Sequence, residues 1–174
     1  AVLDDEWAVT HGLATLRWIR ASHSDPSALR HNLGGVGGLL DDQVQVAAAC
    51  LEAFEVTGQD EWLAWSAAIM DRCWQDFRDP AGGLHDTVSG TGEGLLPSRL
   101  TPIEDAPAPS ANGVAAITMA RLSVHTGDPG WAERRDAILG PFAGAAPQLG
   151  VHGATLTRAL SWAALPETHL VIVE

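Results

Sequence analysis

The chain has 174 residues, and a hydrophobic share of 46% is that of a folded domain with its own core rather than of a disordered segment. Its net charge of −12 comes from 22 acidic and 10 basic residues, all of the latter arginines; an acidic surface repels phosphate backbones and argues against nucleic acid as a partner. The chain contains no run of about 18 apolar residues and no segment with the features of a secretory signal peptide, so we expect no membrane span and a cytoplasmic protein.

The first predicted helix covers residues 5–21 and begins after Asp4 and Asp5, whose carboxylates suit a helix start because they accept hydrogen bonds from free backbone N–H groups. Trp7 and His11 lie one turn apart on this helix. A short second helix is expected over 26–31, followed by a glycine-rich connector.

The next helix, 41–56, opens on Asp41 and Asp42 and is apolar on nearly every side, as expected of a core helix. Helix 60–78 is amphipathic, and its stripe of apolar residues predicts core packing rather than a cofactor site. The stripe consists of Trp62, Trp65, Ile69, Cys73 and Phe77. Cys50 and Cys73 lack a Cys-x-x-Cys motif, so we expect two buried, reduced thiols and no metal site.

Residues 79–109 are rich in Gly and Pro and should form an irregular segment, in which 79–86 is a turn that leads into a short strand. A loop of this length in a compact domain usually carries function. It holds most of the reactive side chains that lie outside helices, namely His85, Asp86, Arg99, Glu104 and Asp105.

Helix 111–125 is again apolar all round, with Ser110 or Asn112 as its predicted cap and Gly127 as its left-handed end. An outer helix should follow from Trp131 and end or kink at Gly140-Pro141. Another helix is expected over 152–165, and residues 168–174 have the composition of a strand.

These helices repeat. At a constant offset of 69 residues, Thr57-Gly58 recurs as Thr126-Gly127, Trp62 as Trp131, and Asp41 aligns with Ser110. Leu3-Asp4-Asp5-Glu6 resembles Leu40-Asp41-Asp42-Gln43 and suggests a third copy. Helical hairpins that cannot bury their own apolar faces must stack on one another. The sequence therefore predicts an all-α fold in one domain, 1–174: a partial α/α toroid of about three hairpins with a short β-rich insertion and a C-terminal strand.

Several motifs resemble the C-terminal region of YyaL-like proteins, the spermatogenesis-associated type of thioredoxin-domain proteins. They are Leu40-Asp41-Asp42, Thr57-Gly58 with Trp62, Phe77-x-Asp79-x-x-Gly82-Gly83, Asp105-Ala-x-x-Pro109-Ser110-Ala111-Asn112, Thr126-Gly127-Asp128-Pro129 and Leu170-Val-Ile-Val173. The resemblance implies a six-hairpin, glycosidase-like toroid that accompanies a thioredoxin-like domain. The cysteine motif of that domain is absent here, so we expect no redox activity and no cofactor.

The first functional hypothesis is a carbohydrate-active or sugar-binding lobe, because toroids of the glycosidase and sugar-epimerase type hold their cleft at one end of the inner helices. Sugar chemistry needs a proton donor, a carboxylate or base, and an aromatic platform. The N-termini of helices 5–21, 41–56 and 111–125 should then converge. The catalytic candidates are Asp41, Asp42, His85, Glu104 and Asp105, and the substrate-binding candidates are Trp7, His11, Arg99 and Asn112.

The second hypothesis is a non-catalytic helical scaffold that packs on a thioredoxin-like domain, on the remainder of the toroid or on another protein. Helix capping would then explain the aspartates at the helix starts. Because a partial ring exposes an apolar edge, we expect the chain to self-associate, to bind its missing half or to be only marginally stable.

Overall fold

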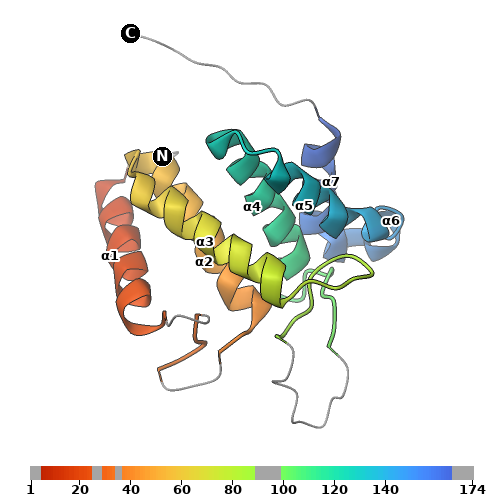
Figure 1. Cartoon of the computed structure of the whole chain (residues 1–174), viewed down its shortest axis with the longest axis horizontal. Coiled ribbons are helices and arrows are strands. Elements are labelled where there is room, and N and C mark those ends of the chain that lie inside the picture. The colour runs from red at the N-terminus through yellow and green to blue at the C-terminus, as the bar shows by residue number, and fades with distance from the viewer. Residues whose placement is uncertain (1–4, 25–28, 34–36, 89–98, 166–174) are drawn as a thin grey trace.

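A computed structural model describes residues 5–24, 29–33, 37–88 and 99–165, and in these residues the fold is all-α, as predicted (Figure 1). The helices are α1 (Glu6–Ser22), α2 (Leu40–Thr57), α3 (Asp60–Asp76), α4 (Ala111–Thr126), α5 (Gly130–Leu139), α6 (Ala146–Leu149) and α7 (Ala154–Ala164). Short 3₁₀ turns, Gly140–Phe142 and Gly150–Gly153, link the last three helices. No described helix is long and apolar enough to cross a membrane.

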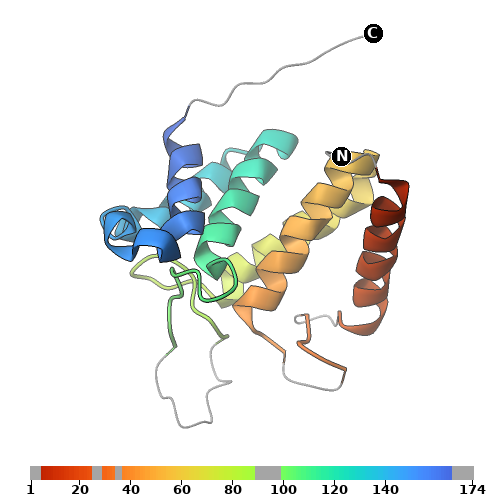
Figure 2. The same cartoon turned by 180° about the vertical axis from the view of Figure 1, so that it is seen from behind.

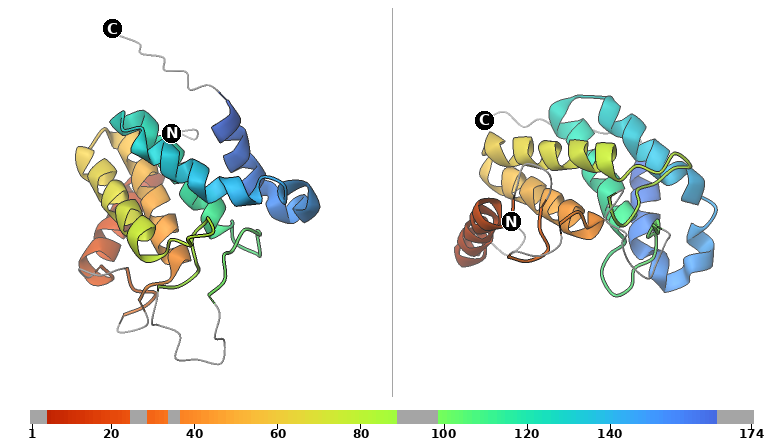
Figure 3. Two further views of the ribbon diagram at one scale, coloured as in Figure 1. Left: turned by 45° about the vertical axis from the view of Figure 1, so that its right-hand side comes forward. Right: turned by 60° about the horizontal axis from the view of Figure 1, so that its bottom comes forward.

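The helices that follow α1 form two layers. Helices α2, α4 and α7 run in the same direction in one layer, and α3 and α5 return along the other, as the right-hand view of Figure 3 shows. Helix α4 lies at the centre, in contact with α2, α5 and α7. Every residue of α4 from 111 to 120 is buried, which agrees with its predominantly apolar sequence.

The corners of the hairpins α2–α3 and α4–α5 make the same set of hydrogen bonds. Gly58 and Gly127 both adopt the left-handed conformation, with φ of 65° and 70°. The hydroxyls of Thr57 and Thr126 each donate to the carbonyl four residues earlier, over 2.6 Å. The glycine N–H groups also donate to the carbonyls four residues earlier, over 2.7 and 2.9 Å. The repeat predicted from the sequence therefore corresponds to two helix corners with the same backbone conformation and the same hydrogen bonds.

The predicted apolar stripe of α3 is confirmed as core. Trp62, Trp65, Ile69, Cys73 and Phe77 are all buried, and Trp131 of α5 is buried as well. Cys50 and Cys73 are free thiols in this core. Burial raises the pKa of each thiol to about 12, so neither is a reactive thiolate at neutral pH.

Helix α1 corrects the predicted arrangement. Its first residues lie beside the C-terminal end of α2, and its last residues lie beside the N-terminal end of α2, so the two helices are antiparallel (Figures 1 and 2). The N-termini of α2 and α4 converge as predicted, but that of α1 lies at the opposite end. The reason is that the described part of the α1–α2 connection holds no helix to bring the chain back before α2 begins.

Two smaller predictions also change. The described part of the expected helix 26–31 is not helical, because Leu29 and Arg30 form isolated bridges to Ser24 and Gly37. The described part of the irregular segment holds single bridges, Leu39 to Thr87 and Arg78 to Leu84, rather than a strand. The predicted C-terminal strand, 168–174, lies outside the described residues.

Candidate functional site

Asn112, a predicted substrate-binding residue, is fully buried at the start of α4. Its Oδ1 accepts a hydrogen bond from the N–H of Leu84 over 2.7 Å. Its Nδ2 donates to the carbonyls of Leu84 and Pro102, both over 2.9 Å. Both amide donors are thus in use, and Ser110 rather than Asn112 caps α4. Asn112 fastens the irregular segment to the helix end and offers no group to a substrate.

Asp105 joins α4 to α7. Its Oδ1 accepts from the N–H of Ser110 over 2.8 Å, and its Oδ2 accepts from the N–H of Thr155 over 2.9 Å. Burial opposes ionisation of this carboxyl, but the backbone N–H groups of Thr155 and Ser110 prevail and hold the pKa of Asp105 below its ordinary value. Asp105 is therefore a poor candidate for a proton donor near neutral pH.

The other predicted residues of the irregular segment do not form an acid–base pair. The Nε2 of His85 lies 3.6 Å from Asp79 Oδ2, and its buried Nδ1 has no hydrogen-bond partner among the described residues. The Nε of Arg99 donates to the carbonyl of Thr87 over 2.8 Å. Glu104 is exposed. This segment covers the N-terminal ends of α2, α4 and α7 and satisfies backbone groups there.

Trp7 and His11 stack on one another, with ring centroids 5.1 Å apart and ring planes 8° from parallel. Trp7 is 71% exposed. These two predicted substrate-binding residues therefore lie together as an exposed pair of rings. The pair lies at the wrong end of the molecule for the predicted cleft, however, because α1 is antiparallel to α2.

Asp41 and Asp42 line a pocket of about 300 Å³ between the end of α1, residues 29–31 and the start of α2. Nδ1 of His31 lies 3.1 Å from Asp42 Oδ1. Trp18, 56% exposed, lies on the α1 side of this pocket, and its ring centroid is 4.7 Å from that of His23. We call this the Asp41–Asp42 pocket. It combines carboxylates, imidazoles and an open aromatic surface.

The paired aspartates are not caps of α2. The residue before the helix, Leu39, makes no side-chain capping bond, and the N–H of Leu40 donates to the carbonyl of Asp86 over 2.9 Å. Capping does hold for α1, where Asp5 accepts from the N–H groups of Trp7 and Ala8; Asp4 lies outside the described residues. Neighbouring residues on a helix do not face each other, so Asp41 and Asp42 are not a facing pair. Asp41 instead accepts from Gln45 over 3.2 Å.

A charged cluster occupies the other end of the parallel helices. Arg121 lies 2.8 Å from both Glu52 and Glu55, and Nε2 of His125 lies 2.8 Å from Glu55. Burial opposes ionisation of Glu55, but the hydrogen bonds from His125 and Arg121 outweigh it and lower the pKa of Glu55. These groups satisfy one another and tie α2 to α4.

No protein-family model matches the chain. The chain is 28% identical to human spermatogenesis-associated protein 20 over an alignment of 150 residues. This alignment covers 86% of the chain and 19% of the human protein. The mouse and rat proteins of the same name are 30% identical over 124 residues, or 71% of the chain and 16% of their own length.

The chain is a homologue of a segment of spermatogenesis-associated protein 20. The resemblance drawn from the motifs is thereby confirmed. The chain spans less than a fifth of these relatives, 16–19% of their length. The name spermatogenesis-associated protein 20 states no reaction or ligand, so the function must be argued from the site.

Sequence reasoning missed Trp18, His23 and His31, which contribute to the Asp41–Asp42 pocket. Trp18 falls off the apolar stripe formed by Leu13, Leu16 and Ile19, and that position was the available signal in the sequence. No local pattern connects His31 with Asp42, because only the fold of the connection brings them together.

Proposed function

We propose that the chain is a sugar-binding lobe of an α/α toroid and that the Asp41–Asp42 pocket is its binding site. The observation that carries this proposal is that Trp18, His31, Asp41 and Asp42 line one pocket. An open indole face suits the apolar face of a sugar ring, and carboxylates accept hydrogen bonds from hydroxyl groups. The alternating layers of α2–α3 and α4–α5 support the toroid part of the proposal.

The proposed activity of this chain alone is binding rather than turnover. Glycosidases need two carboxyl groups across the scissile bond, roughly 5–9.5 Å apart. Asp41 and Asp42 diverge from one helix, and Asp105 is held by backbone N–H groups. A catalytic partner would have to come from elsewhere in a larger protein. The buried, free thiols fit a reducing compartment, so we retain the cytoplasm as the proposed location.

Calorimetric titration with a panel of neutral, acidic and amino sugars tests this proposal. At least one sugar should bind, and Trp18→Ala and Asp42→Asn should each weaken it about tenfold or more, the loss of one or two good contacts. Trp7→Ala and Asp60→Asn are matched controls: an exposed tryptophan at the other end of α1, and an acidic residue in the first turn of α3. Absence of binding by every sugar, or equal losses in the controls, would refute it.

A second function, a non-catalytic helical scaffold, is favoured by a separate observation. A large apolar groove lies open between α1 and α2. The resemblance implies a thioredoxin-like domain as the partner. Light scattering of the chain mixed with that domain from a relative would detect the complex, and two unchanged monomer masses would exclude it.

A further inference from the structure

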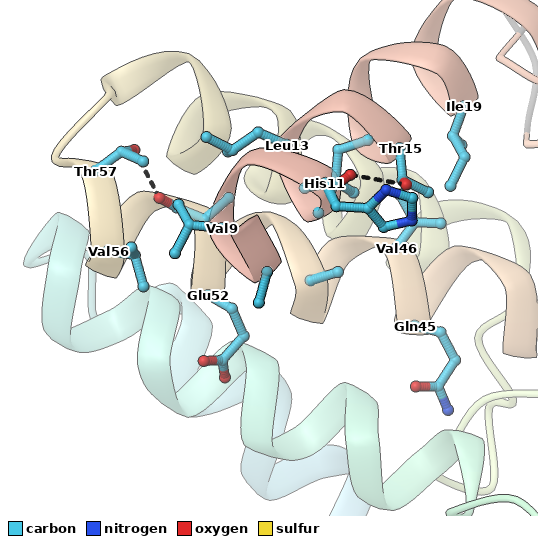
Figure 4. Close-up of a pocket in the computed structure, with 15 residues that line it drawn as sticks. Val9, His11, Leu13, Thr15, Ile19, Gln45, Val46, Glu52, Val56 and Thr57 are labelled. Atoms are coloured by element: carbon cyan, nitrogen blue, oxygen red, sulfur yellow. Dashed lines mark hydrogen bonds between the residues drawn. The ribbon is translucent and has the colours of Figure 1, made fainter. Parts of the chain in front are cut away.

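A groove of about 660 Å³ lies between α1 and α2 (Figure 4). Figure 4 shows that side chains from both helices line it. The larger apolar side chains that line it are Val9, Leu13, Leu16 and Ile19 of α1 and Val46 and Val56 of α2. Within the described residues no further element fills it. We call this feature the α1–α2 groove.

The apolar side chains that line the α1–α2 groove are only partly buried by the rest of the fold. Leu16 is the one fully buried residue in the described helix α1, and Leu13 and Ile19 are half-buried. On the facing wall, Val56 is 45% exposed. Covering these side chains would remove apolar surface from water, which stabilises a complex by roughly 25 cal/mol per Å².

The shape suits a helix. From Val9 to Ile19 the groove follows α1 for about 15 Å at 1.5 Å per residue, the length of nearly three helical turns. Its floor includes the small residues Gly12, Ala49 and Ala53. A Cβ atom added at Gly12 would meet nothing within 4 Å, so the space above it is open. An amphipathic helix that lays its apolar face into a hydrophobic groove is a common mode of recognition.

Charge selects the kind of helix. Glu6 begins α1 at one end of the groove, and Asp41 and Asp42 follow beyond the other end. Glu52 also lines the groove near Glu6, but it is already paired with Arg121 over 2.8 Å. The whole chain carries a net charge of −12. A second copy would bring a further −12 to this face, and the carboxylate of a fatty acid would meet like charge at either end.

We propose that the α1–α2 groove binds an amphipathic helix of a partner protein that carries arginine or lysine at both ends of its apolar stripe. The apolar stripe, at positions i, i+3, i+4 and i+7, covers the walls formed by Leu13, Ile19 and Val46. The basic ends face the carboxylates. This proposal does not depend on sugar binding at the adjoining Asp41–Asp42 pocket.

A displayed library of helical peptides, about fourteen residues each so that they span the groove, is the probe. Selection on the chain, with counter-selection on Gly12→Leu, should enrich amphipathic sequences with basic ends. Gly12→Leu fills the open space and replaces a poor helix former by a good one, so the variant should remain folded. A selected peptide should bind Gly12→Leu at least tenfold more weakly in fluorescence anisotropy, and exchange of its basic residues for glutamate should weaken binding as much.

Ala14→Leu is the matched control, since it adds the same side chain to an exposed position of α1 that does not line the groove. This variant should bind the peptide as the parent does. The proposal is overturned if no helical sequence is enriched, if acidic peptides bind equally well, or if Gly12→Leu binds unchanged. It is also overturned if the chain dimerises through the groove or if a fluorescent fatty acid occupies it. Sugar titration of Gly12→Leu keeps the two proposals separate, because its Asp41–Asp42 pocket is intact.

Discussion

Asp105 and Asn112 are polar residues of the kind expected in a cleft, and both are occupied by backbone groups instead. The starts of α4 and α7 present N–H groups without helical partners, and the irregular segment carries carbonyl and amide groups that are removed from water. Leaving such groups without partners costs about 1–3 kcal/mol each. The polar side chains therefore stabilise the joint between helices.

Asp105→Asn should lower the free energy of unfolding at neutral pH by about 1–3 kcal/mol, because an amide can accept at only one of the two positions and turns an N–H group towards a backbone N–H. Since the pKa of Asp105 is lower in the folded state, its contribution is present above about pH 3.9, the ordinary aspartate pKa, and is lost as pH falls through the folded pKa. The difference between parent and variant should shrink in acid, as urea titrations at several pH values would reveal.

Glu104→Gln is the control for this prediction, because it removes a negative charge from the neighbouring, exposed residue. It should change the stability by less than about 0.5 kcal/mol. A difference between parent and Asp105→Asn that stays constant from pH 7 to about pH 3 would contradict the assigned role of the carboxylate.

At the scale of the element, the ends of the hairpin helices repeat more faithfully than their starts. Gly58 and Gly127 terminate α2 and α4 in the same conformation at the 69-residue offset. The starts differ: α2 begins at Leu40, one residue before Asp41, whereas α4 begins after the aligned Ser110. A left-handed glycine is a local device, but the start of α2 relies on the carbonyl of Asp86, which arrives from a distant segment.

Trp62 and Trp131 follow the two corners, and both are buried. Truncation of either to alanine should cost about 3–5 kcal/mol, the usual loss for a large core aromatic residue. Urea denaturation followed by circular dichroism measures this loss. Trp7→Ala, at a position that is 71% exposed, should leave the midpoint nearly unchanged. An unmoved midpoint for either core variant would show that the repeated corner does not carry equivalent packing.

At the scale of the whole molecule, stability is distributed unevenly. Helix α4 buries twelve of its sixteen residues, whereas α1 buries only Leu16. Arg17 and Arg20 add contacts across the surface, over the rings of Trp62 and Trp65, with centroid distances of 5.7 and 5.3 Å. Surface contacts of this kind contribute roughly 0.5–1 kcal/mol each. Helix α1 is therefore the least firmly held of the long helices.

Native-state hydrogen exchange should find that α1 opens at a lower free energy than α2–α5, in a step that leaves the remaining helices folded. Leu16→Ala should lower the opening free energy of α1 by about 2–4 kcal/mol or detach the helix entirely, with little effect on exchange in α4. Met119→Ala, in the centre of α4, should instead lower the exchange free energies of α2–α5 together and leave the opening free energy of α1 nearly unchanged. If α1 exchanges only through global unfolding in the parent chain, this picture of the molecule is wrong.

Local sequence determined the helices and how they end. Gly58 and Gly127 relieve the strain of a left-handed residue, and the apolar stripe of α3 must be buried wherever that helix lies, so neither inference needs knowledge of the fold. Cys50 and Cys73 were predictable in the same way. The all-α class follows from these periodicities, because each depends on residues within one or two turns of each other.

The tertiary structure alone decided the direction of α1 and the fate of the polar side chains. Reversing α1 leaves its apolar pattern unchanged, so its sequence could not reveal that Trp7 and His11 lie far from Asp41. Whether Asp105 and Asn112 face a ligand or a backbone depends on Thr155, Leu84 and Pro102, which meet them only after the chain has folded. Hydrogen bonds between distant segments leave no periodic trace in the sequence, and these bonds, rather than helix propensity, determine which side chains remain available at the site.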